Sequence, residues 1–287
     1  MYSLFCVSVA VDFFRLSLKR EVVSDLAGQS GRGKPLSANG RTAAVGVMNA
    51  AVRLGLVLGL YLVAASPSLA QITQDAYVAN QHDGTVSVVD TATQVVSTIT
   101  LGSTGNGLLG VAVTPDGQRA YVTDQSNNIV SVIDTATHAV VNTIAGGIPG
   151  GVAVTPDGLH AYVTNQSDNT VSVIDTATQA VVSTIPVGSN PYGVAVTSNG
   201  LHAYVTNNSD NTVSVIDTAT HTVISTIHVG SDPFGVTVTP DGLHAYVTNN
   251  ADNTVSVIDT ATQLVINTIE VGIRPYGVTM TPDGLHA

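Results

Sequence analysis

The sequence is short of cysteine and of positive charge. Cys6 is the single cysteine among 287 residues, which excludes a disulfide framework and any metal site built from several cysteines. Nine basic residues stand against 20 acidic ones. Proteins that bind nucleic acid need clustered Lys and Arg to displace counterions, so this balance argues against a nucleic-acid partner. With 44% hydrophobic residues, the chain still has the apolar content of a folded protein.

The sequence also lacks the short motifs that mark common catalytic and cofactor sites. It contains no H-E-x-x-H, no C-x-x-C-H and no G-x-S-x-G motif. Residues 28–34, GQSGRGK, imitate a phosphate-binding loop, but Pro35 stands where that loop needs Ser or Thr. We interpret this match as chance and expect no cofactor.

Positive charge is confined to the first part of the chain. Residues 1–70 hold seven of the nine basic residues, whereas residues 71–287 hold two arginines and 17 acidic residues. Within the first part, the apolar run LGLVLGLYLVAA (54–65) follows Arg53 and precedes SPSLA. A positive segment, a short apolar run and small residues are the layout of a secretory signal. Residues 48–70 are therefore predicted to be a signal peptide that is cleaved after Ala70.

The same segment predicts the location of the protein. The apolar run is shorter than the roughly 20 residues that span a bilayer. We therefore expect export to the periplasm or the cell surface, with no stable membrane span after cleavage; an uncleaved anchor is the alternative. Met48 would begin a compact signal, so residues 1–47 are predicted to be a disordered extension or the product of a wrongly assigned start.

From Asp75 onward the chain repeats a unit of about 42 residues. Its clearest markers are the tyrosines of the AYVAN, AYVTD and AYVTN segments: Tyr77, Tyr121, Tyr162, Tyr204 and Tyr246. Each unit holds four short runs rich in Val, Ile, Thr and Tyr, which predict strands. In one unit these runs are 161–165, 170–175, 180–187 and 193–197. Four antiparallel strands in each repeat are typical of a β-propeller.

The repeated segments resemble a known family. YVTN, DNTVSVIDTAT and PxGVAVTPDG are similar to the motifs of the YVTN-repeat β-propellers, which include archaeal surface-layer proteins and exported bacterial proteins. The resemblance covers roughly residues 75–287 and assigns residues 71–287 to one propeller domain. It implies an all-β fold of four-stranded antiparallel blades, usually seven. It implies little about activity, because the motif residues are structural.

The number of blades depends on how the two ends of the array pair. If the strands of a blade are named a to d from the centre outward, the array begins on strand b and gives five b–c–d triplets. Strand a also occurs five times, at 110–114, 151–155, 193–197, 235–239 and 277–281. We predict five blades, with Gly277–Thr281 closing the ring on the first triplet, because closure removes exposed sheet edges. A closed ring is expected to be a monomer. The alternative is a fragment of a seven-bladed propeller.

The loops from strand d to strand a hold the candidate ligand-binding residues. Tyr192, Phe234 and Tyr276 occupy one repeat position in consecutive blades, close to Asp232 and Arg274. A one-sided aromatic cluster with an arginine can bind a planar or anionic ligand. The alternative is that these rings plug the mouth of the central channel and pack against the proline before each of them.

Two other sets of residues recur too regularly to form a single site. The histidines His160, His202, His244 and His286 are spread over successive repeats, which favours a solvated ring over a shared metal. An aspartate opens every DTAT turn: Asp90, Asp134, Asp175, Asp217 and Asp259. We interpret these as turn residues, since one active site needs only one or two carboxylates.

The residues therefore favour a non-enzymatic exported propeller that acts as a scaffold for a protein or glycan partner at the envelope. The alternative is a periplasmic enzyme, lactonase-like or lyase-like, or a small-ligand-binding module that uses the d–a loops. Propellers host such enzymes, and the fold alone does not decide between these functions. A third hypothesis, an accessory domain of a larger redox protein, has no copper or haem ligand set here.

Overall fold

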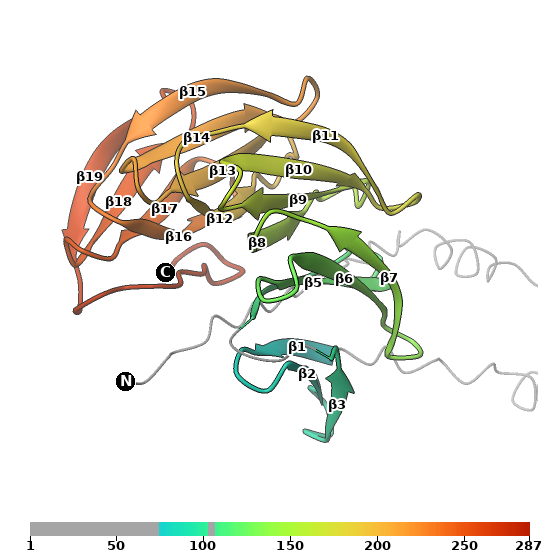
Figure 1. Ribbon diagram of the computed structural model, residues 1–287. Coiled ribbons are helices and arrows are strands. Elements are labelled where there is room, and N and C mark those ends of the chain that lie inside the picture. Colours follow the sequence, from blue (N-terminus) through green and yellow to red (C-terminus); the bar gives the residue numbers. More distant parts are fainter. Residues whose placement is uncertain (1–74, 103–106) are drawn as a thin grey trace, which may run out of the picture. The chain divides into compact units, whose positions relative to one another are not determined.

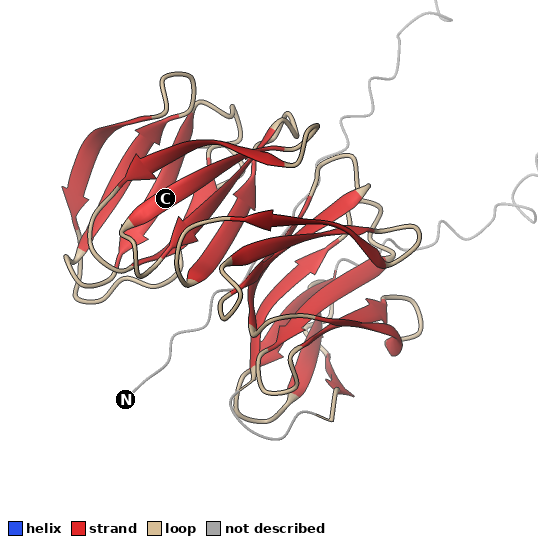
Figure 2. Ribbon diagram, turned by 45° about the horizontal axis from the view of Figure 1, so that its top comes forward, coloured by secondary structure: helices blue, strands red, loops and turns tan. Residues whose placement is uncertain are grey.

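The computed structural model describes residues 75–102 and 107–287, which form β-strands joined by short turns (Figure 1, Figure 2). The predicted signal peptide, its cleavage point and the extension before it lie outside the described residues. Within the described part, no helix is long and apolar enough to cross a membrane.

The strands β1 to β19 form five antiparallel sheets in chain order. The first sheet contains β1 (Asp75–Asn80), β2 (Thr85–Asp90) and β3 (Val96–Thr100). The second contains β4 (Leu108–Val113), β5 (Arg119–Asp124), β6 (Ile129–Asp134) and β7 (Ala139–Ala145). The third contains β8 (Pro149–Val154), β9 (His160–Asn165), β10 (Thr170–Asp175) and β11 (Ala180–Pro186). The fourth contains β12 (Pro191–Val196), β13 (His202–Asn207), β14 (Thr212–Asp217) and β15 (Thr222–His228). The fifth contains β16 (Pro233–Val238), β17 (His244–Asn249), β18 (Thr254–Asp259) and β19 (Leu264–Glu270).

Turn chemistry explains why the strands end where they do. In the third sheet, the Thr155 hydroxyl donates to Asp157 Oδ1 at 2.5 Å, and Gly158 takes φ +74° in the turn between β8 and β9. Only a residue without Cβ adopts that φ at no steric cost. The β10–β11 turn is held by Asp175, whose Oδ1 accepts from the Thr178 amide at 2.7 Å. The same two turns recur along the chain and set its 42-residue period.

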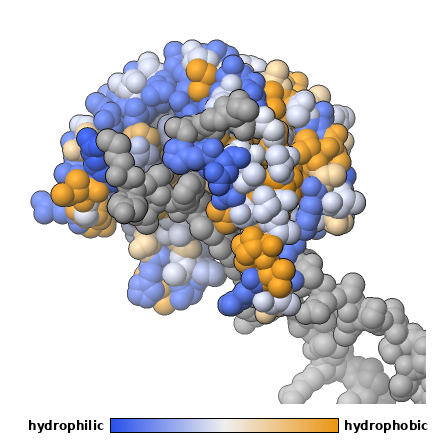
Figure 3. All heavy atoms as spheres, turned by 60° about the horizontal axis from the view of Figure 1, so that its bottom comes forward, coloured by the Kyte–Doolittle hydropathy of each residue, from blue (hydrophilic) through white to orange (hydrophobic). Residues whose placement is uncertain are grey.

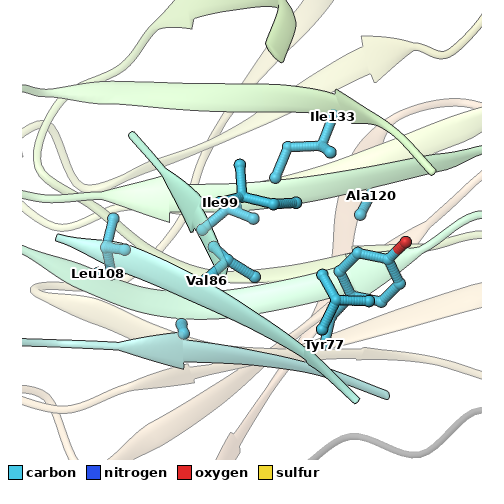
Figure 4. Packing of buried hydrophobic residues seen from close by; sticks show 9 residues of the cluster. Tyr77, Val86, Ile99, Leu108, Ala120 and Ile133 are labelled. Atoms are coloured by element: carbon cyan, nitrogen blue, oxygen red, sulfur yellow. The ribbon is translucent and has the colours of Figure 1, made fainter. Parts of the chain in front are cut away.

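The hydrophobic core lies between successive sheets. Four clusters of buried residues occur in the described part of the chain, and each joins two consecutive sheets. In Figure 4, Tyr77, Val86 and Ile99 of the first sheet face Leu108, Ala120 and Ile133 of the second. Full burial of one such aliphatic side chain contributes about 1.5–3 kcal/mol, so neighbouring sheets stabilise one another.

The outermost strands carry apolar residues into solvent. Val96 is 57% exposed, Val182 54% and Ile266 56%. Figure 3 shows apolar patches on the surface among hydrophilic atoms. Scattered exposed valines and isoleucines are ordinary for a folded surface. In β3 and β11 the buried residue is the isoleucine near the end of the strand, Ile99 or Ile185, whereas the equivalent Ile269 of β19 is 40% exposed.

A threonine in strand b links each inner strand to the next. The Thr164 hydroxyl accepts from the Gly151 amide at 2.9 Å and donates to the Tyr192 carbonyl at 2.8 Å, so it joins β8 to β12. Equivalent pairs of bonds are made by Thr123, Thr206 and Thr248. In the first sheet Ala79 occupies this position and has no hydroxyl.

The all-β fold with four-stranded antiparallel blades is confirmed, but ring closure is not shown. Gly277–Thr281, predicted to be an inner strand, forms no strand, and the described part of the first sheet has three strands instead of four. The segment lies against the fifth sheet, where the Tyr276 carbonyl accepts from the Thr248 hydroxyl at 2.7 Å. It therefore docks as an inner strand does, but within the described residues it pairs with no strand b. Ala79 also lacks the hydroxyl that binds the inner-strand amide in the other sheets.

Candidate ligand-binding face

The d–a loops are attached to the b–c hairpin tips of the preceding sheet. Asn190, Asp232 and Arg274 occupy the same turn position, each at a φ between 52° and 56°. Their amides donate to the side-chain Oδ1 of the tip asparagines, at distances of 2.9, 3.0 and 2.8 Å for Asn169, Asn211 and Asn253. Loops 187–190, 229–232 and 271–274 thus lie on one face together with these tips. We call this surface the loop face.

The structure brings the three predicted aromatic residues together beside the loop face. The ring centroids of Tyr192 and Phe234 are 4.5 Å apart with planes at 65°, and those of Phe234 and Tyr276 are 4.4 Å apart at 44°. Such inclined contacts are the favoured geometry of aromatic pairs. Tyr192 and Phe234 are half-buried, whereas Tyr276 is 52% exposed. The row of rings therefore has one open end, at Tyr276.

The two predicted charged residues are not joined to one another. Asp232 and Arg274 are exposed on adjacent loops, and within the described residues neither forms an ion pair. The ion pair that the described residues contain joins Arg119 Nη1 to Asp134 Oδ2 at 2.5 Å, and these residues pair across β5 and β6. Because the hydrogen bonds that these two residues make within the described residues use their backbone groups, the side chains of Asp232 and Arg274 are available to a ligand.

The loop face offers aromatic rings, a guanidinium and phenol groups. Burial raises the pKa of Tyr192 to about 12, and the nearby Tyr276 adds to the rise. The phenol therefore stays protonated at neutral pH and can donate a hydrogen bond. An exposed tyrosine ring and a planar cation two residues away in the sequence suit stacking and hydrogen bonding with a planar or oxygen-rich ligand.

The repeated aspartates are used by the turns that they open. Asp175 and Asp217 each accept hydrogen bonds from a threonine amide and hydroxyl three residues later. These bonds hold the pKa of both carboxyls below the usual value. The pKa is lowered in the same way at Asp90, Asp134 and Asp259. A carboxylate held ionised by its own turn is poorly suited to proton transfer.

The marker tyrosines belong to the core. Tyr121, Tyr162 and Tyr204 are fully buried, and Tyr77 is nearly so. Tyr162 Oη donates to the Thr218 carbonyl of the next sheet at 3.5 Å. Tyr246, in the fifth sheet, is only half-buried. These residues pack blades together and do not reach the loop face.

The recurring histidines His160, His202 and His244 begin strand b directly after the a–b turn, and His286 lies in no strand. His160 meets His221, from the β14–β15 turn of the next sheet, with ring centroids 5.4 Å apart at 80°. Its counterparts His202 and His244 are half-buried and His286 is exposed. Among residues 75–102 and 107–287, no group of three His, Cys, Asp or Glu is placed to hold a metal ion.

The sequence did not predict that the Thr and Asn of the YVTN segment form hydrogen bonds between and within sheets. Besides the threonine link, Asn165 Nδ2 donates to Thr170 Oγ1 at 3.1 Å and to Ser172 Oγ at 2.9 Å. The signal was present, because a T-x-S pattern follows the tip in most repeats. Its meaning depends on which face of strand c these hydroxyls occupy, and that becomes visible only in the folded sheet.

Solved structures support the propeller fold. Hydrazine synthase of Kuenenia stuttgartiensis is similar with a TM-score of 0.60 and 29% identity, over 62% of this chain and 53% of that one. The chain thus spans about half the length of that protein. A functionally unknown protein from Desulfotomaculum acetoxidans DSM 771 gives a TM-score of 0.60 at 19% identity, over 72% of this chain and 71% of that one, and shows the fold alone.

Sequence comparison identifies the family. No curated protein matches this chain. The YNCE-like β-propeller family, however, matches at residues 86–200 and 194–286, which together make up more than half of the sequence. The match includes most of the strands and all three loops of the loop face. This chain therefore belongs to the YNCE-like β-propeller family.

Proposed function

We propose that this chain is an exported, non-enzymatic propeller of the YVTN-repeat type. On this proposal it acts as a binding scaffold for a protein or glycan partner at the cell envelope. The observation that carries the proposal is the open end of the aromatic row: Tyr276 is 52% exposed and follows the exposed Arg274 by two residues. Tyrosine and arginine are both among the residue types that are enriched in recognition surfaces.

The division between constant and variable residues supports a scaffold role. The recurring Thr, Asn and Asp side chains are used in hydrogen bonds within and between sheets, as at Thr164, Asn165 and Asp175. By contrast, the residue before the inner GV pair changes from repeat to repeat: Leu109, Gly150, Tyr192, Phe234 and Tyr276. Four of these five residues lie at the start of an inner strand, next to a d–a loop, so variation is concentrated beside the loops of a constant frame. Loops and the residues that flank them are where binding specificity is usually located.

The composition of the repeat region is compatible with export. Residues 71–287 contain no cysteine and no lysine, and they follow the predicted signal at 48–70. A domain without thiols folds independently of the redox state of its compartment. The predicted signal and this composition together support a location outside the cytoplasm.

The similarity to hydrazine synthase supports the fold and no specific chemistry. The matched stretch covers 53% of that chain, and the repeated residues in this chain serve turns and sheet contacts. Because one propeller can host unrelated functions, we propose no hydrazine chemistry for this chain.

Fractionation and envelope binding test the proposal. The full chain, produced with a C-terminal tag, is expected to be cleaved near Ala70, to leave the cytoplasm and to bind purified envelopes. R274A/Y276A should weaken that binding at least fivefold, because both exposed groups of the open end are lost. R119A is the matched control, since it removes the arginine paired with Asp134 instead. An uncleaved cytoplasmic protein would contradict export, and equal binding by both variants would contradict the site.

A further inference from the structure

Two neighbouring grooves do not include the aromatic row. Each lies between the start of a d–a loop and strands c and d of the sheet that follows this loop. Both are shallow and open to solvent, with volumes of about 550 Å³ in the fourth sheet and about 590 Å³ in the fifth. The first is lined chiefly by Gly188, Asp210, Thr212, Ser214, Thr226 and His228. The second is lined by the equivalent Gly230, Asp252, Thr254, Ser256 and Thr268, together with His228. His228 belongs to both, so the grooves adjoin.

The floor of each groove is a set of hydroxyl groups that accept hydrogen bonds from one asparagine. Asn207 Nδ2 donates to Thr212 Oγ1 at 3.0 Å and to Ser214 Oγ at 2.9 Å. Both oxygens therefore accept from the amide and keep one proton each to donate. Thr212 is 5% exposed and Ser214 2%, so a ligand reaches this floor only at the bottom of the groove. In the fifth sheet, Asn249 Nδ2 binds Thr254 and Ser256 in the same way, at 2.9 Å each.

A further hydroxyl stands beside this set in each groove. Thr226 pairs across the strands with Ser214, and Thr268 pairs with Ser256. Both threonines are exposed, and neither hydroxyl has a hydrogen-bond partner among the described residues. Each can donate one hydrogen bond and accept two.

The walls add an acceptor and an apolar strip. Asp210 Oδ2 accepts from the Ser189 amide at 2.6 Å, which fixes the carboxylate at the end of the groove while leaving it further acceptor sites. Asp252 is fixed in the same way by the Ser231 amide at 2.7 Å. Val187 and Val223 line the fourth-sheet groove, and Val229 and Val265 line the fifth-sheet groove.

We propose that these two grooves bind a linear, neutral oligosaccharide. Sugars present hydroxyl donors and acceptors around apolar C–H faces, which matches hydroxyls, a carboxylate and valines in one groove. The carboxylates Asp210 and Asp252, in a repeat region with 17 acidic residues and two arginines, repel a polyanion. Because the grooves adjoin at His228, an extended chain can occupy both and gain avidity. This inference deepens the scaffold role proposed above and rests on it.

Titration calorimetry with defined sugars tests the inference. The full chain is titrated with cellohexaose, maltohexaose and chitohexaose, and with an oligogalacturonate as the anionic comparison. At least one neutral hexasaccharide should bind, and T226V/T268V should weaken that binding at least fivefold. Each single variant should have a smaller effect. T222V is the matched control, because Thr222 lies on β15 outside both groove linings.

Melting temperatures establish that the variants remain folded, which is expected because both threonines are exposed. Absence of binding to all three neutral sugars overturns the inference, as does equal weakening by T222V or preference for the oligogalacturonate. If the protein binds envelopes but no sugar, the scaffold role is still supported and the proposal that the grooves bind sugar is wrong. Sugar binding without export or envelope binding would contradict the proposed role instead.

Discussion

The third and fifth sheets carry almost the same residues but differ in how well these are buried. Ile185 in β11 is 2% exposed, whereas Ile269 at the same position of β19 is 40% exposed. Tyr162 is fully buried, and its counterpart Tyr246 is only half-buried. Ile185 packs in a cluster shared with the fourth sheet. A blade of this kind therefore obtains its core from its neighbour, as in other repeat architectures.

Removing the same side chain from the two sheets should give the largest difference. I185A is expected to lower the free energy of unfolding by about 3 kcal/mol, because it leaves a cavity between two sheets. I269A should cost about 1 kcal/mol or less, since much of that side chain is already in water. Urea unfolding monitored by circular dichroism measures both. Equal losses would show that the fifth sheet is covered as fully as the third in solution.

The same glycine of the d–a loop has different surroundings before the fourth sheet and at the end of the array. A Cβ at Gly188 would lie 2.6 Å from Cγ of the fully buried Asn207, whereas a Cβ at the equivalent Gly272 would meet nothing within 4 Å. G188A should therefore cost about 1–3 kcal/mol through overpacking. G272A should be neutral or should stabilise the protein by up to about 1 kcal/mol, because alanine lowers the conformational entropy of the unfolded chain.

Thermal and urea unfolding of the two glycine variants provide the measurement. Because the substitution and the repeat position are identical, each variant is the control for the other. A loss of stability in G272A as large as in G188A would mean that residues near 272 contact another strand b, as ring closure requires.

The strands could be predicted from the sequence because their signals are local. The runs predicted at 161–165, 170–175 and 180–187 correspond to His160–Asn165, Thr170–Asp175 and Ala180–Pro186. The inner strand predicted at 193–197 begins earlier, at Pro191, because its pairing with β13 is irregular between Pro191 and Val194. Period-two alternation and turn residues decide such elements without help from distant parts of the chain.

Pairing between distant segments could be predicted only in part. The 42-residue spacing placed Tyr192, Phe234 and Tyr276 in neighbouring blades, and the structure brings their rings together. The link from the Thr164 hydroxyl to the Tyr192 carbonyl depends on the distance between two sheets, which no local pattern records. For the same reason Gly277–Thr281 has the sequence of an inner strand but forms none, since a strand needs a partner as well as a propensity.

The smallest expected effect concerns acid sensitivity and compares the third sheet with the fourth. Asp157 accepts from the Thr155 hydroxyl at 2.5 Å and the Leu159 amide at 2.9 Å, and these bonds lower its pKa. Asn199 accepts the same two bonds, at 2.7 and 3.0 Å, without a titratable group. A carboxyl whose pKa is lowered by folding stabilises the protein above its unfolded pKa, and this contribution is lost as the pH falls through the lowered value.

D157N should therefore melt close to the wild-type temperature at pH 7, because Asn199 shows that an amide can hold the same turn. Between pH 5 and pH 3, D157N should lose slightly less stability than the wild type, since one carboxyl with a lowered pKa has been removed. The reciprocal variant N199D should lose slightly more over the same interval. Melting curves at both pH values test the pair. Identical acid sensitivity in all three proteins would show that these turns open before their carboxylates are protonated.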